Sequence, residues 1–171
     1  MDNRLHEILD DISGFHIYNL SDMCICEYVS ESLCEMTGYS RDELLASAEG
    51  NDCLSGYEKL VHVADRQVFD EFIERLKNGT GKQEAEYRII GKSGNIMWVR
   101  DSAAPKMTDD SGMVAYSVLT DITELKKNND NLTFLNETIP CGFLKYTCEK
   151  QPKVTYVNNQ MLEMLRFPQV K

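Results

Sequence analysis

The run Met113-Val-Ala-Tyr-Ser-Val-Leu-Thr-Asp-Ile-Thr123, followed by the segment 124–139, decides how the chain is organised. Residues 113–120 are rich in apolar and β-branched side chains and predict a β-strand. After the polar joint Asp121-Ile122-Thr123, apolar residues recur at helical spacing. They are Leu125, Leu132, Leu135 and Ile139. A strand that passes into a helix at a polar joint can carry a conformational change. We therefore interpret the residues before the joint as a sensor body and the helix as its coupling element.

The composition excludes several classes of protein. The 171 residues suit one domain of ordinary size with some residues left over. The formal net charge of -10, from 28 acidic and 18 basic residues, argues against nucleic-acid binding, which needs clustered Lys and Arg. No apolar run reaches the ~18 residues of a membrane span, and no signal-peptide pattern opens the chain. We expect a cytoplasmic segment without membrane contact, although a longer parent protein could be membrane-anchored. The six cysteines are expected to be reduced thiols.

The order of the predicted elements indicates an α+β fold. A short amphipathic helix is expected at residues 3–12. Strands are predicted at 15–18, 23–29, 83–90, 96–104 and 113–120. Helices are predicted at 31–36, 41–45 and 66–78, with a loop at 46–56. Ser40 and Glu43 form a capping box, and Asp65 is expected to cap the long helix. The apolar face expected for that helix comprises Val68, Phe69, Phe72, Ile73 and Leu76. Antiparallel strands joined by tight turns, with helices on one side, give an α+β architecture.

Alternation along the strands predicts which side chains face a cavity beneath the helices. Ala85, Tyr87 and Ile89 share one face of their strand, whereas Trp98 and Val99 lie on opposite faces of theirs, and the pattern leaves open which of these two points inward. The pocket candidates are Phe69, Phe72, Tyr87, Ile89, Val99 and Val118. No cluster of charged groups is expected to converge there. This favours a small apolar ligand, a water-filled pocket or an unoccupied core.

The chain also repeats itself with an offset of 128 residues. The matching pairs are Gly14-Phe15 with Gly142-Phe143, Tyr18 with Tyr146, Tyr28-Val29 with Tyr156-Val157, and Glu35-Met36 with Glu163-Met164. Just upstream the offset is 127, which aligns Leu5, Ile8 and Ile12 with Leu132, Leu135 and Ile139. The second copy therefore begins inside the coupling helix. About forty residues cannot bury a core of their own, so we expect the sequence to belong to a longer multi-domain protein.

Several motifs, in the right order, resemble those of the PAS sensor family. They are Tyr28-Val29-Ser30, the run Met36 to Leu45, Leu60-Val-His-Val-Ala-Asp-Arg66, Glu86-Tyr87-Arg88, Lys92-Ser-Gly94, Trp98-Val99-Arg100 and Asp121-Ile122-Thr123. Val63 stands where the family commonly has a proline. The resemblance covers about residues 12–123, with a truncated second copy from about 132. It divides the chain into an N-terminal helix (1–12), a PAS sensor domain (13–123), a linker or coiled-coil helix (124–139) and the start of a second PAS domain (140–171).

The resemblance implies a five-stranded antiparallel sheet with helices on one face, over a small cavity. Such modules sense a small ligand or dimerise, and relay the change through the C-terminal helix. The output domain, often a histidine kinase of a two-component system or a diguanylate cyclase, would lie outside this chain, which is not itself expected to be an enzyme. The signal-relay candidates are Asp121, Thr123, Leu125 and Leu132. The side chains of Asp121 and Thr123 can bond to backbone, with Thr123 as a helix cap. Heptad spacing predicts a parallel coiled coil and a homodimer, with Asn128 interrupting the seam; alternatively, this face packs on its own domain.

An alternative function is a cofactor-bearing redox or light sensor that holds flavin or haem. His62 is the candidate haem ligand, and Cys24 and Cys26 with His16 are a candidate soft-metal or redox site. No histidine pair has metal-ligand spacing, and the two cysteines are better explained as buried apolar side chains. No cysteine lies in the Asn-Cys-Arg-Phe context of flavin-adduct sensors. No glycine-rich phosphate loop or nucleophile motif supports catalysis. We therefore predict no metal and no cofactor, and leave an unknown small molecule as the possible ligand.

Overall fold

The computed structural model describes residues 14–20, 25–45, 56–79, 81–108 and 112–165. Contacts divide the chain into two units, Met1–Thr123 and Glu124–Lys171, and each is described by itself. The helix expected at 3–12 and nearly all of the loop expected at 46–56 lie outside the described residues.

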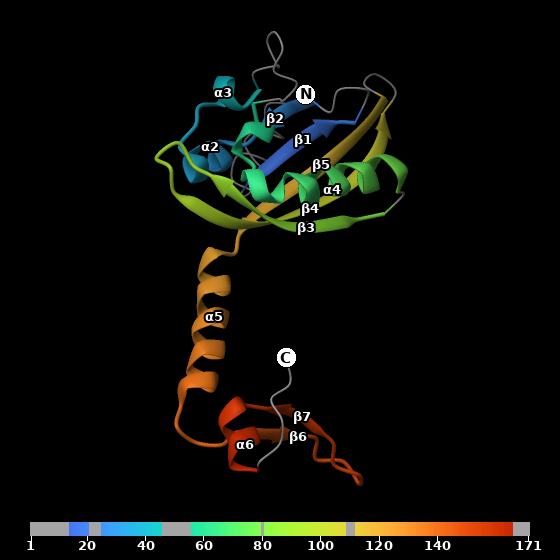
Figure 1. Cartoon of the computed structure of the whole chain (residues 1–171). Coiled ribbons are helices and arrows are strands. Elements are labelled where there is room, and N and C mark those ends of the chain that lie inside the picture. The colour runs from blue at the N-terminus through green and yellow to red at the C-terminus, as the bar shows by residue number, and fades with distance from the viewer. Residues whose placement is uncertain (1–13, 21–24, 46–55, 80, 109–111, 166–171) are drawn as a thin grey trace. The chain divides into compact units, whose positions relative to one another are not determined.

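Unit 1 is built on a five-stranded antiparallel sheet (Figure 1). Its strands are β1 (Phe15–Asn19), β2 (Ile25–Val29), β3 (Gln83–Ile90), β4 (Ile96–Thr108) and β5 (Gly112–Asp121). Their order in space is β2-β1-β5-β4-β3, so the last strand lies in the centre of the sheet. Because β5 pairs with both β1 and β4, it joins the N-terminal pair of strands, β1 and β2, to the hairpin of β3 and β4. This confirms the predicted α+β class and the five-stranded sheet.

The helices of unit 1 are α2 (Glu31–Thr37), α3 (Arg41–Leu45) and α4 (Arg66–Asn78), with 3-10 turns at Glu58–Leu60 and Val63–Asp65. Local hydrogen bonds fix where the first two begin and end. Ser30 Oγ accepts from the N–H of Leu33, and Gly38, at φ 77°, ends α2 in the left-handed conformation that glycine adopts readily. The predicted capping box is present, since Ser40 N–H donates to Glu43 Oε2 at 2.8 Å and Glu43 N–H donates to Ser40 Oγ at 3.3 Å.

The capping box also anchors the turn between β3 and β4, because Lys92 Nζ donates to Glu43. That bond is the main reason that the pKa of Glu43 falls to about 2.

Asp65 occupies the N-cap position of α4, as predicted, but its carboxylate does not cap the helix. Its side chain makes no capping hydrogen bond and instead accepts three bonds from Arg88 of β3. The backbone N–H of Arg88 lies 2.8 Å from Oδ2, and the guanidinium Nε and a terminal nitrogen lie 2.7 and 2.6 Å from the two carboxylate oxygens. A two-pronged guanidinium–carboxylate contact is stronger than a single cap bond, so the partner in space outcompetes the local one. Asp65 thus ties the start of α4 to the sheet, and hydrogen bonding by Arg88 lowers its pKa.

The main core lies between the sheet and the helices. Val99 points into it, whereas Trp98 lies on the other face of β4 beneath the guanidinium of Arg88, 5.3 Å from the ring centre. Each large apolar side chain buried here contributes ~1.5–3 kcal/mol. The buried face of α4 comprises Phe69, Phe72, Ile73 and Leu76. Val68, predicted to share that face, is 40% exposed because it lies at the edge of the apolar stripe.

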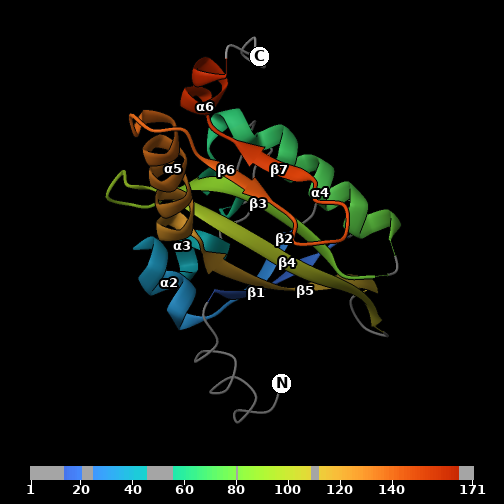
Figure 2. The same cartoon turned by 90° about the horizontal axis from the view of Figure 1, so that it is seen from below.

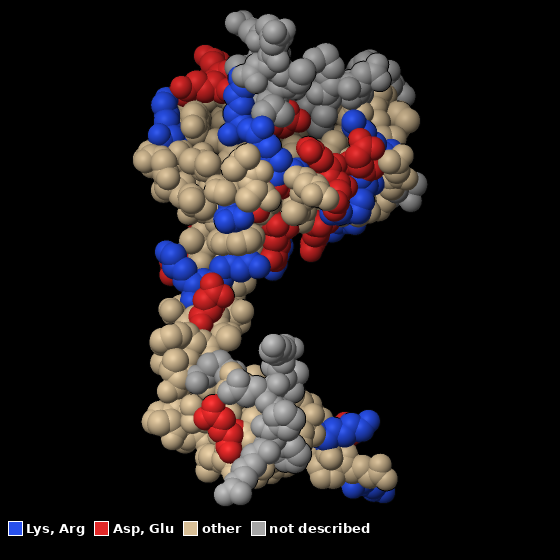
Figure 3. Space-filling view, viewed as in Figure 1, with Lys and Arg blue, Asp and Glu red and all other residues tan. Residues whose placement is uncertain are grey.

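The opposite face of the sheet carries a second, smaller cluster. Its members are Phe15, Ile17, Tyr28 and Val114, with Tyr116 and Val118 packed against them. Acidic and basic side chains are interspersed on the face shown in Figure 3. Exposed ion pairs of unit 1 include Lys82 with Glu84, at 2.8 Å. No helix in the described part of the chain has the length and apolar character needed to cross a bilayer.

Unit 2 begins with α5 (Thr123–Thr138), followed by β6 (Leu144–Tyr146), β7 (Val154–Val157) and α6 (Asn159–Met164). β6 and β7 pair antiparallel (Figure 2). Their register repeats that of β1 and β2 with the offset of 128: His16 pairs with Val29, and Leu144 pairs with Val157. The register shift after Ile17 recurs after Lys145. Backbone geometry therefore repeats where the sequence repeats.

We predict that Asp65→Asn lowers the free energy of unfolding by ~1.5–3 kcal/mol at pH 7, because it weakens charge-assisted bonds to Arg88. The folded-state pKa of Asp65 is lowered, so this stabilisation is fully present above the unfolded value of about 4 and is lost as the pH falls through the folded value. Urea unfolding at several pH values measures the difference. Glu84→Gln, in an exposed pair, is the control and should leave stability almost unchanged, because solvent screens such pairs. Equal effects of the two substitutions would contradict the prediction.

Candidate functional site

Six polar side chains meet in the core of unit 1, and we call them the polar cluster. They are His16 and Tyr18 of β1, Tyr57, Tyr87 of β3, Asp101 of β4 and Ser117 of β5. All six are essentially inaccessible to solvent. The sheet order explains how they meet, since β1, β5, β4 and β3 are successive neighbours and His16 pairs directly with Ser117. Alternation then directs one side chain in two from each strand into the same core.

Asp101 is the centre of the polar cluster. Its Oδ2 accepts from the hydroxyl of Tyr87 at 2.6 Å and from that of Tyr18 at 3.3 Å, and its Oδ1 accepts from Ser117 Oγ. Tyr57 and Tyr87 hydroxyls lie 3.1 Å apart, so Tyr57 donates to Tyr87, whose own proton goes to the carboxylate. Removing an ionised carboxylate from water costs several kcal/mol, and only such a set of donors makes it tolerable.

Burial keeps the three phenols protonated. It is the main reason that the pKa values of Tyr18, Tyr57 and Tyr87 lie well above the ordinary value, and the charge of Asp101 raises them further. Each phenol therefore has one proton to donate at neutral pH.

His16 borders Asp101 and is the least satisfied member of the polar cluster. Its Nδ1 lies 3.1 Å from the backbone oxygen of Gly14. Its Nε2 is buried without a hydrogen-bond partner and lies 3.7 Å from Asp101 Oδ2. The ring stacks on Tyr57 at 4.9 Å and meets Tyr18 edge-on at 4.6 Å. Aromatic packing thus fixes the imidazole in this position.

The structure places five of the six predicted pocket residues in the main core with the polar cluster. These are Phe69, Phe72, Tyr87, Ile89 and Val99, all fully buried. The ring of Phe69 lies 5.4 Å from that of Tyr87. Val118 was assigned to the wrong face: Ser117 and Leu119 point into the main core, whereas Val118 packs in the cluster on the opposite face.

The sequence analysis named no charged residue in the core, but one acidic side chain, Asp101, is fully buried there. The signal was available in β4, where Asp101 follows Met97 and Val99 at intervals of two. Alternation alone places the carboxylate on the buried face. The flanking residues Arg100 and Ser102 make the segment look exposed, and they hide this pattern.

The joint between β5 and α5 holds the two predicted relay residues. Asp121 Oδ1 accepts from the N–H of Thr123 at 2.8 Å, as a residue at a helix start does. Thr123 Oγ1 does not cap the helix; it accepts from the N–H of Trp98 in β4 at 2.9 Å. The N–H of Ile122 donates to the oxygen of Trp98 at 2.8 Å. The joint therefore forms hydrogen bonds with both the backbone N–H and the backbone oxygen of Trp98. Both relay side chains bond to backbone, as the sequence indicates.

The predicted seam of α5 is exposed. Its four apolar residues, Leu125, Leu132, Leu135 and Ile139, are 58, 61, 52 and 41% exposed. A stripe of this kind normally becomes buried against a partner.

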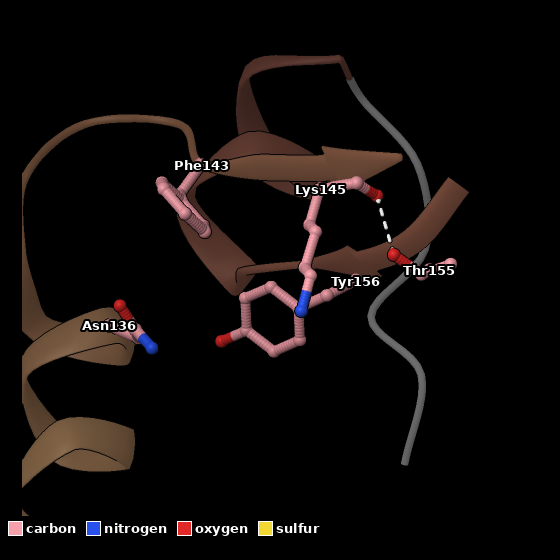
Figure 4. Close-up of a pocket in the computed structure, with 5 residues that line it drawn as sticks. All are labelled: Asn136, Phe143, Lys145, Thr155 and Tyr156. Carbon is pink, nitrogen blue, oxygen red and sulfur yellow. Dashed lines mark hydrogen bonds between the residues drawn. The ribbon is translucent and has the colours of Figure 1, made fainter. Parts of the chain in front are cut away.

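Unit 2 contains a groove of about 630 Å³ beside β6 and β7. Figure 4 shows the rings of Phe143 and Tyr156 on the side that faces Asn136, with Lys145 and Thr155 completing the lining. Three of these residues are the repeat equivalents of Phe15, Ile17 and Tyr28, which are buried in unit 1. There, residues of β5 cover them. Within the described residues no strand pairs with the second edge of β6, so the groove marks an uncovered sheet face.

The other candidate metal or cofactor residues have structural roles. His62 Nδ1 accepts from the N–H of Ala64 at 3.2 Å and begins a 3-10 turn. Cys26 is a buried free thiol that bonds to the oxygen of Tyr28, whereas Cys24 lies outside the described residues. Among the described residues, no group of three or more His, Cys, Asp or Glu could hold a metal ion.

An antiparallel five-stranded sheet with helices on one face and a polar cluster in its core defines the architecture of this α+β module. A family model for the PAS fold matches residues 27–120, more than half of the chain. The chain therefore belongs to the PAS family, as its motifs predict. No curated protein matches it.

Solved structures support the same fold. The N-terminal domain of a diguanylate cyclase with PAS/PAC sensor from Marinobacter aquaeolei is 17% identical, with a TM-score of 0.52 over 66% of this chain and 96% of that chain. The PAS domain of a Colwellia psychrerythraea protein is 21% identical, with a TM-score of 0.53 over 71% and 97%. A sensory box histidine kinase/response regulator from Burkholderia thailandensis is 17% identical, with a TM-score of 0.53 over 77% and 92%. At these identities the similarity shows the fold alone.

We predict that Tyr87→Phe lowers the free energy of unfolding by ~1.5–3 kcal/mol, because it removes the shortest phenol bond to the Asp101 charge. Tyr116→Phe removes the same atom from the outer cluster and should cost less than ~0.5 kcal/mol. Denaturant unfolding of both variants measures the difference. Tyr87→Phe with the stability of Tyr116→Phe would show that the polar cluster is not an energetic centre.

Proposed function

We propose that unit 1 senses a small molecule in its core and relays the change through α5 to an output domain outside this sequence. The observation that supports this most directly is the short path from the polar cluster to the joint. Asp101 lies three residues along β4 from Trp98, and the joint grips Trp98 through Thr123 and Ile122. Asp101 also pairs with Leu119, two residues before Asp121 on β5.

The energies suit a switch. Each neutral hydrogen bond at the joint contributes only ~1 kcal/mol, so a ligand with a modest difference in affinity for two conformations can break one. A ligand that changes the bonding of Asp101 would shift β4 against β5. The bond from Trp98 to Thr123 would respond first, because it is the link between those two strands nearest to α5.

We further propose that α5 serves two modules. Among the described residues of unit 2, Asn158 is fully buried although it is polar, and its amide group has four partners. Its Oδ1 accepts from the N–H groups of Phe143 at 2.7 Å and Met161 at 3.1 Å. Its Nδ2 donates to the oxygens of Asn136 at 2.8 Å and Cys141 at 3.0 Å. The last turn of α5 is thus fixed to β6 and α6, so a displacement of the helix would reach the second copy first.

Residues 140–171 would then be the start of a second PAS domain. The repeated register, the repeated shift after Lys145 and the equivalence of Asn158 with Ser30 support this. The titles of the similar structures name a diguanylate cyclase and a histidine kinase, and either is a suitable output domain for the proposed parent protein. We propose a cytoplasmic location for the segment.

A thermal-shift screen against small metabolites tests the sensory proposal. A ligand at 100 times its Kd should stabilise the protein by about 2.7 kcal/mol. The same ligand should move the amide signals of Trp98 and Thr123 in the native protein. Thr123→Val keeps the shape of the side chain but removes the oxygen that accepts from Trp98. This variant should still bind the ligand, but ligand binding should no longer change the amide signal of Trp98. Amide signals unchanged by a bound ligand would contradict the relay, and a visible absorption band in the purified protein would favour the flavin or haem alternative.

We predict that Leu132→Asp with Ile139→Asp weakens a dimer formed through α5 by at least about 100-fold, because charges replace apolar contacts at successive seam positions. Sedimentation velocity measures the dimer fraction. Thr133→Asp with Phe134→Asp adds the same two charges on positions away from the seam and should leave the dimer intact. A dimer that survives the seam substitutions would exclude the coiled coil.

A further inference from the structure

We propose that His16 and Asp101 together bind one proton at the centre of unit 1, and that this proton is the signal to which the module responds. Its use as a signal rests on the proposed sensory function, whereas the binding of the proton does not. The inference comes from the position of an unpartnered imidazole nitrogen beside a buried carboxylate.

The first step concerns Nδ1 of His16. The backbone oxygen of Gly14, 3.1 Å away, can only accept a hydrogen bond. If Nδ1 carried a lone pair, two acceptors would face each other inside the core. Nδ1 is therefore protonated, and any further proton of the ring must lie on Nε2.

The second step concerns Nε2. It lies 3.7 Å from Asp101 Oδ2 and has no hydrogen-bond partner. Without a proton, its lone pair faces a carboxylate with no donor between them, and such an arrangement is costly in a buried site. With one proton between the two groups, the imidazolium faces the carboxylate, or a protonated carboxyl group donates to Nε2. Either state removes the conflict, and a rotation of the Asp101 side chain would shorten the distance.

The third step is the balance of charge around the pair. The groups that face it are phenols, a hydroxyl, a thiol and aromatic rings, and no cation is among them in the described part of unit 1. They are Tyr18 of β1, Cys26 of β2, Tyr57 before the first 3-10 turn, Tyr87 of β3, Ser117 of β5 and Phe69 of α4. Arg88 and Arg100 pair with Asp65 and Glu86 away from this core. The shared proton is thus the positive charge nearest to Asp101, and its loss leaves a buried carboxylate without a counter-charge.

The consequence for the fold is directional. A carboxylate that loses its counter-charge must draw more strongly on its donors or gain access to water. The hydroxyl of Tyr18, at 3.3 Å, is the donor with most room to move closer. Tyr18 lies on β1 and Asp101 on β4, with β5 between them, so this change acts across the strand that leads to Asp121.

Nuclear magnetic resonance of the full chain tests the proton directly. Nitrogen-15 shifts of the His16 ring and the carbon-13 shift of the Asp101 carboxyl group together count the protons on the pair. At pH 7.5 we expect one proton in addition to that on Nδ1. In Asp101→Asn the ring should lose it at the same pH, whereas in Asp70→Asn, which removes an exposed charge of α4, it should remain. A wild-type protein with an ionised Asp101 and an unprotonated Nε2 at pH 7.5 would overturn the proposal, as would a ring that stays doubly protonated in Asp101→Asn.

Unfolding provides a second measurement. An unfolded histidine has lost its proton well before pH 7.5, so the folded protein would bind one proton more than the unfolded chain. Stability is then present at lower pH and falls as the pH rises, with the unfolding constant increasing about tenfold per pH unit for one proton. Between pH 7.5 and 8.5 the wild type and Asp70→Asn should show an extra increase of up to about tenfold relative to Asp101→Asn. Equal slopes in all three proteins would overturn the proposal.

The amide signals of Trp98 and Thr123 separate the two claims. If they follow the titration of the pair, both the proton site and the relay are supported. If the pair binds its proton and these signals do not follow it, the site stands and the proposed relay fails.

Discussion

A carboxylate buried at the centre of a sheet is the constraint on which most of unit 1 depends. Burying the Asp101 carboxylate costs free energy of desolvation, and hydrogen bonds from three different strands offset that cost. The donors are Tyr18, Tyr87 and Ser117. Their bonds act only if β1, β5, β4 and β3 keep their register, because a slip of one residue would send every one of these side chains to the other face. The same interaction therefore helps to specify the register of the sheet.

The position of Asp101 in the sheet places it close to the joint between β5 and α5. Asp101 lies on β4, and Thr123 holds the backbone of the same strand three residues away. Helix α5 begins at this joint, and at its other end Asn158 fixes the helix to the strands that follow. Each end of the coupling helix is thus held by side-chain bonds that can be broken one at a time.

The sequence correctly predicted features that depend on hydrogen bonds between residues close together in the chain. The capping box of Ser40 and Glu43 depends on neighbours within four residues, and the structure contains it. The predictions failed where a distant partner decides. Asp65 could have capped its helix, but Arg88, 23 residues away, provides more bonds. The polar cluster was missed for the same reason, since its members come from separate strands and no single segment shows that they meet.

The two copies have the same strand register but different side chains at two key positions. The register of β6 and β7 repeats that of β1 and β2, yet Leu144 stands at the position of His16, and Asn158 replaces Ser30. An apolar side chain cannot exchange a proton, so a second module built on Leu144 would lack half of the His16–Asp101 pair. Asn158, unlike a serine, has two donor hydrogens to hold the end of α5. Divergence at these two positions places an imidazole beside Asp101 in the first copy, and in the second an amide that donates to the backbone near the end of α5.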